Sequence, residues 1–186
     1  MRISPEVIGI VIAAIAVIWI IAAFNGLVAL RTRVQSAWAQ IDVQLKRRHD
    51  VIPNLVEAVR GYMQHERATL EAVTQARAQA IAAGGNVEQR SAAEAVLAAT
   101  LGRLFAVAEN YPQLRAAENV QLLQEQLTST ENRIAYARQF YNDEVMKYNT
   151  AQSTFPRNLF AGMLGFSPSA MFTAEESDRA NVQVKI

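Results

Sequence analysis

The sequence predicts an all-α protein in which a single N-terminal transmembrane helix is followed by an antiparallel (up-down) bundle of about four long helices. Three observations lead to this prediction. An uncharged apolar run opens the chain, apolar residues then recur at spacings of three and four, and the breaks between these stretches are short. We therefore divide the chain into an N-terminal transmembrane anchor (residues 1–30), a helical bundle domain (31–153) and an apolar, aromatic C-terminal tail (154–186).

The anchor is predicted from the stretch between Val7 and Phe24, which contains no charged or strongly polar side chain. As a helix it spans about 27 Å, close to the thickness of a bilayer core. A buried helix of a soluble protein rarely runs this long without a polar face. A cleaved signal peptide has a shorter apolar region and a clearer basic start. We therefore expect an uncleaved, single-pass anchor.

The orientation of the anchor follows from the cations on its two sides. Arg31 and Arg33 lie just after the apolar run, whereas only Arg2 and the amino terminus precede it. Cytoplasmic flanks carry the excess of Lys and Arg. We expect the N-terminus outside and the soluble domain in the cytoplasm.

The first two bundle helices are predicted over residues 25–49 and 51–83. The first can continue the anchor helix directly, and Asp50 followed by Pro53 then predicts a break or a kink, since proline removes a helical hydrogen bond. An apolar stripe runs along the second helix, with Glu66 and Arg77 in stripe positions. We interpret these two charges either as polar layers that fix the register of the helices or as side chains that snorkel near an end of the bundle. Gly84-Gly85-Asn86 ends the second helix.

The third and fourth helices are predicted over residues 87–109 and 116–152, separated by Asn110-Tyr111-Pro112. A heptad repeat of apolar residues along the fourth helix predicts coiled-coil-like packing. The residues predicted to form the core are Val34, Ile41, Leu45, Val59, Leu70, Leu101, Leu104, Leu127, Ile134, Tyr141 and Tyr148.

Catalytic chemistry has little support in this composition. The chain has no cysteine, its formal net charge is +1, and it has two histidines, His49 and His65, in separate predicted helices. His65-Glu66 begins a zincin-like motif, but Thr69 occupies the position of the second histidine. We expect no catalytic residue, no cofactor, no metal site, no small-molecule substrate and no nucleic acid partner. The basic run Lys46-Arg47-Arg48 fits either a contact with anionic lipid or acidic partners, or charges at a helix C-terminus.

Three long segments resemble the LemA family of bacterial membrane proteins: residues 37–66, beginning AWAQIDVQLKRRHD, residues 108–149, beginning AENYPQLR, and residues 155–166, FPRNLFAGMLGF. The resemblance covers essentially the whole chain. Ala117 and Val120 depart from residues that relatives often carry there, Asn and Phe. The matching or candidate partner-contact residues are Trp38, Asp42, Arg47, Arg48, Asp50, Pro53, Asn54, Arg138, Tyr141, Asn142, Tyr148, Asn149, Phe160 and Phe166. We expect Asp50 and Asn54 near a helix start, and Asn142 and Asn149 in interhelical hydrogen bonds.

The resemblance implies a protein of the bacterial cytoplasmic (inner) membrane without an accepted reaction or cofactor. Some relatives are associated with specialised membranes or membrane proteases, which implies a scaffold by analogy. Our leading hypothesis is a membrane-tethered interaction scaffold that is not an enzyme and contacts other membrane proteins, proteases among them, or itself. The alternative is a membrane-organising protein that acts on lipid through oligomers or its tail.

The tail after Phe155-Pro156 carries more large apolar residues than a solvated linker. Three arrangements would cover them: folding back over one end of the bundle, insertion at the membrane interface, or docking to another protein or another copy of this chain. Phe160 and Phe166 are the expected anchors, with Gly162 and Gly165 allowing close backbone approach.

Overall fold

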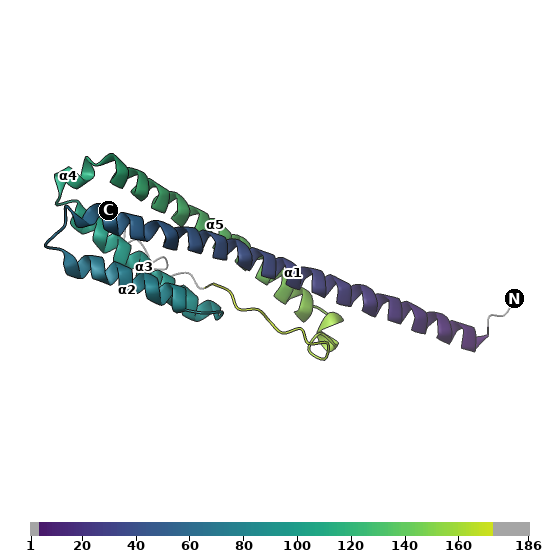
Figure 1. Ribbon diagram of the computed structural model, residues 1–186. Coiled ribbons are helices and arrows are strands. Elements are labelled where there is room, and N and C mark those ends of the chain that lie inside the picture. Colours follow the sequence, from purple (N-terminus) through teal and green to yellow (C-terminus); the bar gives the residue numbers. More distant parts are fainter. Residues whose placement is uncertain (1–3, 173–186) are drawn as a thin grey trace, which may run out of the picture. The chain divides into compact units, whose positions relative to one another are not determined.

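The computed structural model describes residues 4–172, and these contain helices and turns but no strand. The prediction of an all-helical chain is thereby confirmed for the described residues. The chain divides into two compact units (Figure 1). Among the described residues, unit 1 comprises residues 4–39 and 140–169, and unit 2 comprises residues 40–139 and 170–172. The helices are α1 (Pro5–Arg60), α2 (Arg67–Ala82), α3 (Val87–Ala108), α4 (Pro112–Arg115), α5 (Glu118–Ser153) and the 3₁₀ helix η1 (Arg157–Leu159). The last residues of the predicted tail, 173–186, lie outside the described residues.

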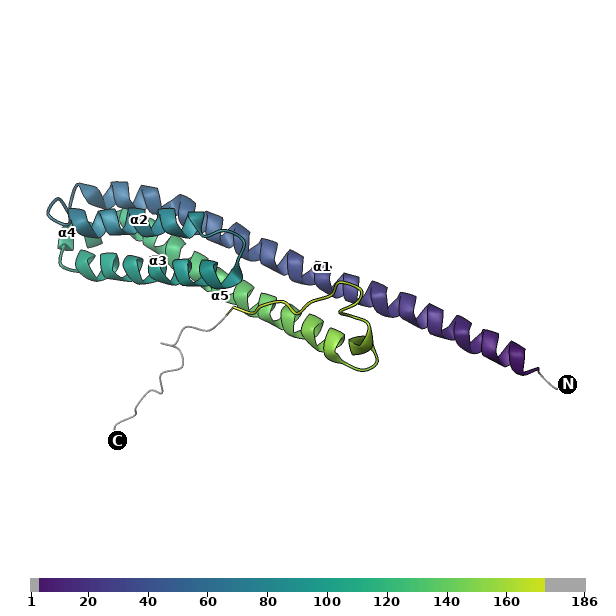
Figure 2. The same ribbon diagram turned by 90° about the horizontal axis from the view of Figure 1, so that it is seen from below.

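Unit 2 packs helices side by side around an apolar core. Residues 40–60 of α1 lie beside α2, α3 and the first part of α5 in both views (Figures 1 and 2). Its core includes Leu55, Val73, Leu97 and Leu104, each nearly inaccessible to solvent. Across both units the structure buries every side chain that the sequence assigned to the core: Val34, Ile41, Leu45, Val59, Leu70, Leu101, Leu104, Leu127, Ile134, Tyr141 and Tyr148.

Helix α1 is continuous from Pro5 to Arg60, and this overturns one predicted boundary. The helix does continue from the apolar stretch through Asn25-Gly26, as expected, but it also passes Asp50 and Pro53 without ending. Consequently Asp50 and Asn54 lie inside a helix instead of near a helix start. The break falls at Gly61, where glycine has poor helix propensity, and α2 begins at Arg67.

The remaining boundaries agree closely with the sequence. The side chain of Asn86 accepts a hydrogen bond from the Glu88 backbone N–H at 2.9 Å and so caps the start of α3. Helix α3 ends at Ala108, before the predicted Asn110-Tyr111-Pro112 break. The short helix α4 was not predicted, and α5 occupies the range of the predicted fourth helix within two residues.

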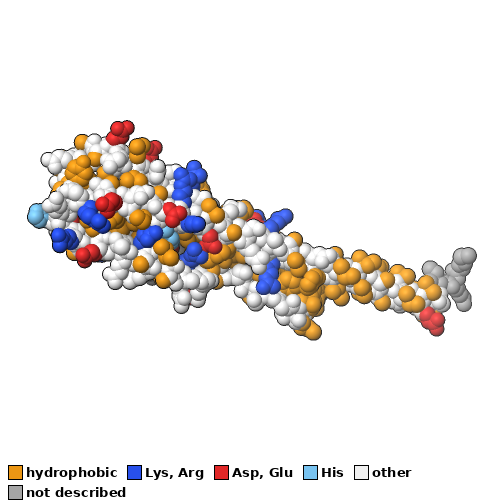
Figure 3. Space-filling model, in the orientation of Figure 1, with side chains coloured by type: hydrophobic (Ala, Val, Ile, Leu, Met, Phe, Trp, Pro, Cys, Tyr) orange, Lys and Arg blue, Asp and Glu red, His pale blue; other side chains and the backbone are white. Residues whose placement is uncertain are grey.

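Unit 1 contains α1 up to residue 39, the C-terminal part of α5 and most of the described tail. The indole of Trp38 meets the Tyr141 ring edge-on, with centroids 5.5 Å apart. The surface of α1 between Val7 and Phe24 is covered with hydrophobic side chains, which Figure 3 shows as a continuous band. By length and composition, α1 and α3 could each cross a membrane. We assign α3 to the core of unit 2, because it carries Arg90, the buried Glu94 and Arg103.

The heptad residues of α5 should dominate the stability of unit 2. Leu127 and Ile134 are buried, so Leu127→Ala and Ile134→Ala should each lower the free energy of unfolding by about 2–5 kcal/mol. Gln124→Ala, at an exposed position of the same helix, should cost less than about 0.5 kcal/mol. Urea unfolding of the detergent-solubilised chain, followed by circular dichroism, measures all three. Equal and small losses at the three positions would contradict a core role for this stripe.

Candidate functional site

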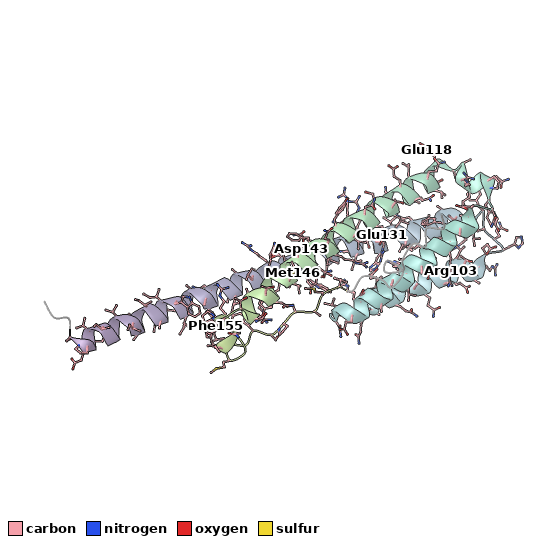
Figure 4. The ribbon with its side chains drawn as sticks, turned by 180° about the vertical axis from the view of Figure 1, so that it is seen from behind. Arg103, Glu118, Glu131, Asp143, Met146 and Phe155 are labelled. Carbon is pink, nitrogen blue, oxygen red and sulfur yellow. The ribbon has the colours of Figure 1, made fainter. Side chains whose placement is uncertain are left out.

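A cluster of charged side chains lies inside unit 2, where α1, α3 and α5 meet. Arg48 on α1 is almost fully buried, and its guanidinium pairs with Glu94 of α3 and, at 2.5 Å, with Glu131 of α5. His49 lies 2.9 Å from the second carboxylate oxygen of Glu94 through Nε2. Glu94 is buried, whereas the Glu131 side chain is about half exposed; Figure 4 marks Glu131 on α5. The cluster ties three helices together through one arginine.

The partners of Glu94 keep it ionised. Burial acts to raise the pKa of this carboxyl, but the hydrogen bond from His49 and the positive charge of Arg48 outweigh burial and hold the pKa below its usual value of 4.5. An ionised carboxylate only accepts hydrogen bonds, so the His49 Nε2 carries the proton and donates. In unit 1, burial raises the pKa of the Tyr141 hydroxyl.

Arg77 explains why α1 does not break at Pro53. A proline has no N–H to donate to the carbonyl four residues earlier, and that carbonyl belongs to His49. The Nε of Arg77, from α2, donates to this oxygen at 2.7 Å. The carbonyl that proline leaves without its helical partner is therefore satisfied from a neighbouring helix. The sequence predicted a polar role for Arg77, and in the structure that role is to donate a hydrogen bond to the His49 carbonyl.

A small pocket of about 260 Å³ adjoins the cluster. It is lined by Asp42, Lys46, His49, Asp50, Ile81 and Arg90. These side chains include acids, bases and one histidine, but no hydroxyl or thiol that could act as a nucleophile. Within residues 4–172 no group of three or more His, Asp or Glu side chains is arranged to hold a metal ion. Two of the groups that could transfer protons, Asp42 and His49, also link α1 to α3.

The family-motif residues separate into several environments. Asp42 pairs with Arg90 of α3 at 2.7 Å, and the Arg138 guanidinium lies 5.4 Å from the centre of the Phe172 ring. Arg47 and Asn54 are exposed, and Asn142 is half-buried. The basic run therefore does not form one surface, because Arg48 points inward while Lys46 and Arg47 face solvent. Its interpretation as charges at a helix C-terminus is wrong, since α1 continues to Arg60.

The tail is fastened to α5 through Asn149. The Asn149 amide donates to the Ser169 carbonyl and accepts from the Ser169 N–H, both at 2.9 Å. The Tyr148 hydroxyl donates to the Ser167 carbonyl at 3.0 Å. Asn149 thus holds the returning tail, whereas an interhelical bond was expected.

The aromatic residues of the tail pack on the apolar stretch of α1. Phe160 meets Trp19 and Phe166 meets Phe24, each edge-to-face with centroids 5.5 Å apart. Phe166 is buried and Phe160 is half-buried. The two anchors expected from the sequence therefore contact the predicted membrane helix itself.

Glu94 and Glu131 are the site residues that the sequence reasoning missed. Glu94 did carry a signal: Arg90 and Glu94 extend the stripe of Leu97, Leu101 and Leu104 backward along α3 at the same spacing. Two charges of opposite sign at core positions indicate a buried pairing with another helix. Glu131 lies next to the buried Thr130 on α5 and gave no comparable signal.

Comparison with known proteins places these features in one family. Residues 37–186 match the LemA family model. The chain is 25% identical over 168 residues to magnetosome protein MamQ of Magnetospirillum gryphiswaldense, covering 77% of this chain and 62% of that relative. It is 26% identical over 174 residues to magnetosome protein MamQ 1 of Paramagnetospirillum magneticum, covering 80% and 64%. It is 27% identical over 160 residues to protein LemA of Metamycoplasma hominis, covering 85% and 72%. The family resemblance read from the sequence is thereby confirmed, and the chain spans somewhat less than two thirds of the length of the MamQ relatives.

Removing Arg77 should cost more while Pro53 is present than when it is replaced. Arg77→Ala leaves the His49 carbonyl without a donor and should cost about 1–3 kcal/mol. In a Pro53→Ala background the new N–H can donate to that carbonyl, so the same substitution should cost about 1 kcal/mol less. Urea unfolding of the four chains in this cycle measures the coupling. Arg133→Ala, at an exposed position of α5, is the control and should show no coupling to residue 53. Additive effects of the Arg77 and Pro53 changes would contradict this account.

Glu94 should make the protein acid-sensitive. Its pKa is lower in the folded chain than in the unfolded chain, so its stabilisation is complete above about pH 4.5 and is lost as the pH falls through the depressed value. Glu94→Gln should therefore cost about 3 kcal/mol at pH 7 and flatten the pH dependence of unfolding below pH 5. Glu131→Gln, at the half-exposed partner, should cost less. Urea midpoints between pH 3 and pH 7 test this, and parallel curves for wild type and Glu94→Gln would contradict it.

Proposed function

This chain belongs to the LemA family, and we propose that it works as a membrane-tethered helical scaffold with no catalysis of its own. In this proposal the apolar stretch of α1 crosses the bacterial cytoplasmic membrane once, with the N-terminus outside and the helical domain in the cytoplasm. Arg31 and Arg33 after the stretch support this orientation. The MamQ relatives are named for a magnetosome, which is a structure and not a reaction. That naming supports an assembly role.

The observation that carries the scaffold role is an open groove on unit 2, between the end of α1 and α2. Its volume is about 810 Å³. Val56, Met63 and Leu70 supply an apolar floor, and Arg60, Arg67 and Glu71 are among the polar residues that line it. A groove with an apolar floor and a charged rim suits the apolar face of an amphipathic helix. We propose a helix of another membrane protein as the occupant.

The charge cluster also supports a binding role, because it argues against catalysis. Arg48, His49 and Glu94 are all buried and engaged with one another, so the side chains best suited to acid-base chemistry hold the helices in place. A fixed helical body with an open groove is better suited to binding than to turnover. We further propose that α5 packs in a coiled-coil-like manner, which its heptad of buried residues supports.

Filling the groove should remove the partner without unfolding the protein. Ala78 lines the groove and is exposed, so Ala78→Arg should block it with little effect on the melting temperature. Ala135→Arg, at an exposed position of α5, adds the same side chain away from the groove. The measurement is chemical cross-linking of the full-length chain in native membranes, followed by detergent extraction and mass spectrometry. We expect a membrane-protein partner to be captured by wild type and Ala135→Arg and lost with Ala78→Arg. An unchanged partner set in Ala78→Arg would contradict the groove as the binding surface.

A further inference from the structure

The tail has an outer face made of large apolar side chains that no described part of the protein covers. Phe155 is 74% exposed, Leu159 65% and Met163 88%, and Leu164 is also exposed. Figure 4 marks Phe155 at the point where α5 ends. Exposed residues of this size, so close together, are unfavourable in water and indicate a surface that meets an apolar partner. The inner face of the same segment, formed by Phe160 and Phe166, is already occupied by α1.

The contacts with α1 fix the depth of this segment along the anchor. A bilayer core that begins at Val7, directly after Glu6, would end near Gly26, since about 20 helical residues cross it. Trp19, the partner of Phe160, then lies about 10 Å inside the core, and Phe24, the partner of Phe166, lies about 3 Å inside. Beside the apolar band on α1, Figure 3 shows further hydrophobic side chains over the tail.

The chain changes from polar to apolar just after α5 ends, at Phe155, and this change lies at a matching level. Tyr141 contacts Trp38, and from there α5 runs toward the apolar stretch of α1. Lys147 is the last charged residue of α5. If both helices rise by the same amount per residue from the Trp38–Tyr141 contact, Lys147 lies at about the level of Thr32, next to Arg31. Phe155 reaches about the level of Phe24. The apolar segment that follows α5 therefore begins at nearly the same height as the edge of the apolar stretch on α1.

Arg157 lies at this edge. Its guanidinium is close to Gly26, where an added Cβ would stand 3.9 Å from Nη2. Among residues 4–172 no carboxylate pairs with Arg157. A long side chain that starts in an apolar segment and ends at the interface matches the way arginine reaches lipid headgroups. Arginine also binds phosphate in a bidentate manner.

We propose that residues 155–164 insert into the leaflet that α1 crosses, with Phe155, Leu159 and Met163 among the acyl chains and Arg157 bound to lipid phosphate. The positive φ of Gly165, +79°, allows the turn that returns the chain toward Asn149. This inference rests on the proposed membrane anchor but not on the scaffold groove. The ligand is the lipid of the same bilayer, so the protein would hold the membrane by a spanning helix and by a second, inserted element.

Spin labels measure this insertion directly, because the natural sequence has no cysteine. Single-cysteine chains Ile12→Cys, Met163→Cys and Met146→Cys are labelled and placed in nanodiscs of phosphatidylglycerol and phosphatidylethanolamine, one chain per disc. All three side chains are exposed, on the anchor, the tail and α5 respectively. Relaxation by oxygen and by a soluble nickel complex gives the depth parameter of each label. We expect it to be positive at Ile12 and Met163, and negative at Met146.

Each outcome decides a separate claim. A negative value at Met163 beside a positive value at Ile12 would overturn lipid insertion while leaving the anchor intact. A label at Met163 closed to both relaxing agents would overturn it in favour of a protein contact. A negative value at Ile12 would overturn the anchor and, with it, this inference.

Arg157 is tested by charge reversal in the Met163→Cys chain. Arg157→Glu should shift the depth parameter of the Met163 label toward that of Met146, whereas Arg157→Lys should preserve the positive value. An unchanged value in Arg157→Glu would remove the phosphate contact from the proposal.

Discussion

Arg48 and Glu94 are both almost fully buried, and neither charge could remain there without the other. Taking a guanidinium and a carboxylate out of water costs several kcal/mol each, which only close pairing and further hydrogen bonds offset. His49 and Glu131 provide those further contacts, and Arg77 closes the layer by binding the His49 carbonyl. The layer fixes the relative heights of α1, α2, α3 and α5 within unit 2, because a shift of one helical turn would separate the charges. An apolar core alone tolerates such shifts more readily.

In unit 1, α1 and α5 pack against the returning tail instead of against α2 and α3. Here α1 presents an apolar stretch, and the tail returns along it with its aromatic residues against Trp19 and Phe24. Asn149 and Tyr148 bind the backbone of the returning chain and so hold it to α5. The polar contacts come from Tyr148 and Asn149, just after the last charged residue of α5, and the apolar contacts of Phe160 and Phe166 lie beyond them. This division is consistent with the proposed insertion of the tail into lipid, which would account for its aromatic residues.

Much of the fold could be predicted from the sequence because helical periodicity reports burial directly. The stripes along α3 and α5 identified core residues such as Leu104 and Ile134.

The boundary between the first two bundle helices could not be found in this way. The stripe runs at unbroken spacing through Val59, Met63 and Leu70, across the turn at Gly61. Pro53 is the strongest local signal for a break, but Arg77, distant in sequence, bonds the carbonyl that the proline leaves without a partner. The stripe of α3 did mark Glu94 as a charge at a core position, but its pairing with Arg48 is long-range and leaves no local pattern. The contact of the tail with Trp19 and Phe24 also depends on tertiary structure alone.

The most direct test of this account is a double-mutant cycle on Arg48 and Glu94, using Arg48→Met, Glu94→Leu and the double variant. Urea unfolding of the full-length chain at pH 7 gives the free energy of each. Each single variant leaves one buried charge without its partner and should lose about 3–5 kcal/mol. The double variant removes both charges and should be more stable than either single variant. Additive losses in the double variant would show that the two charges do not depend on each other, and would contradict the account.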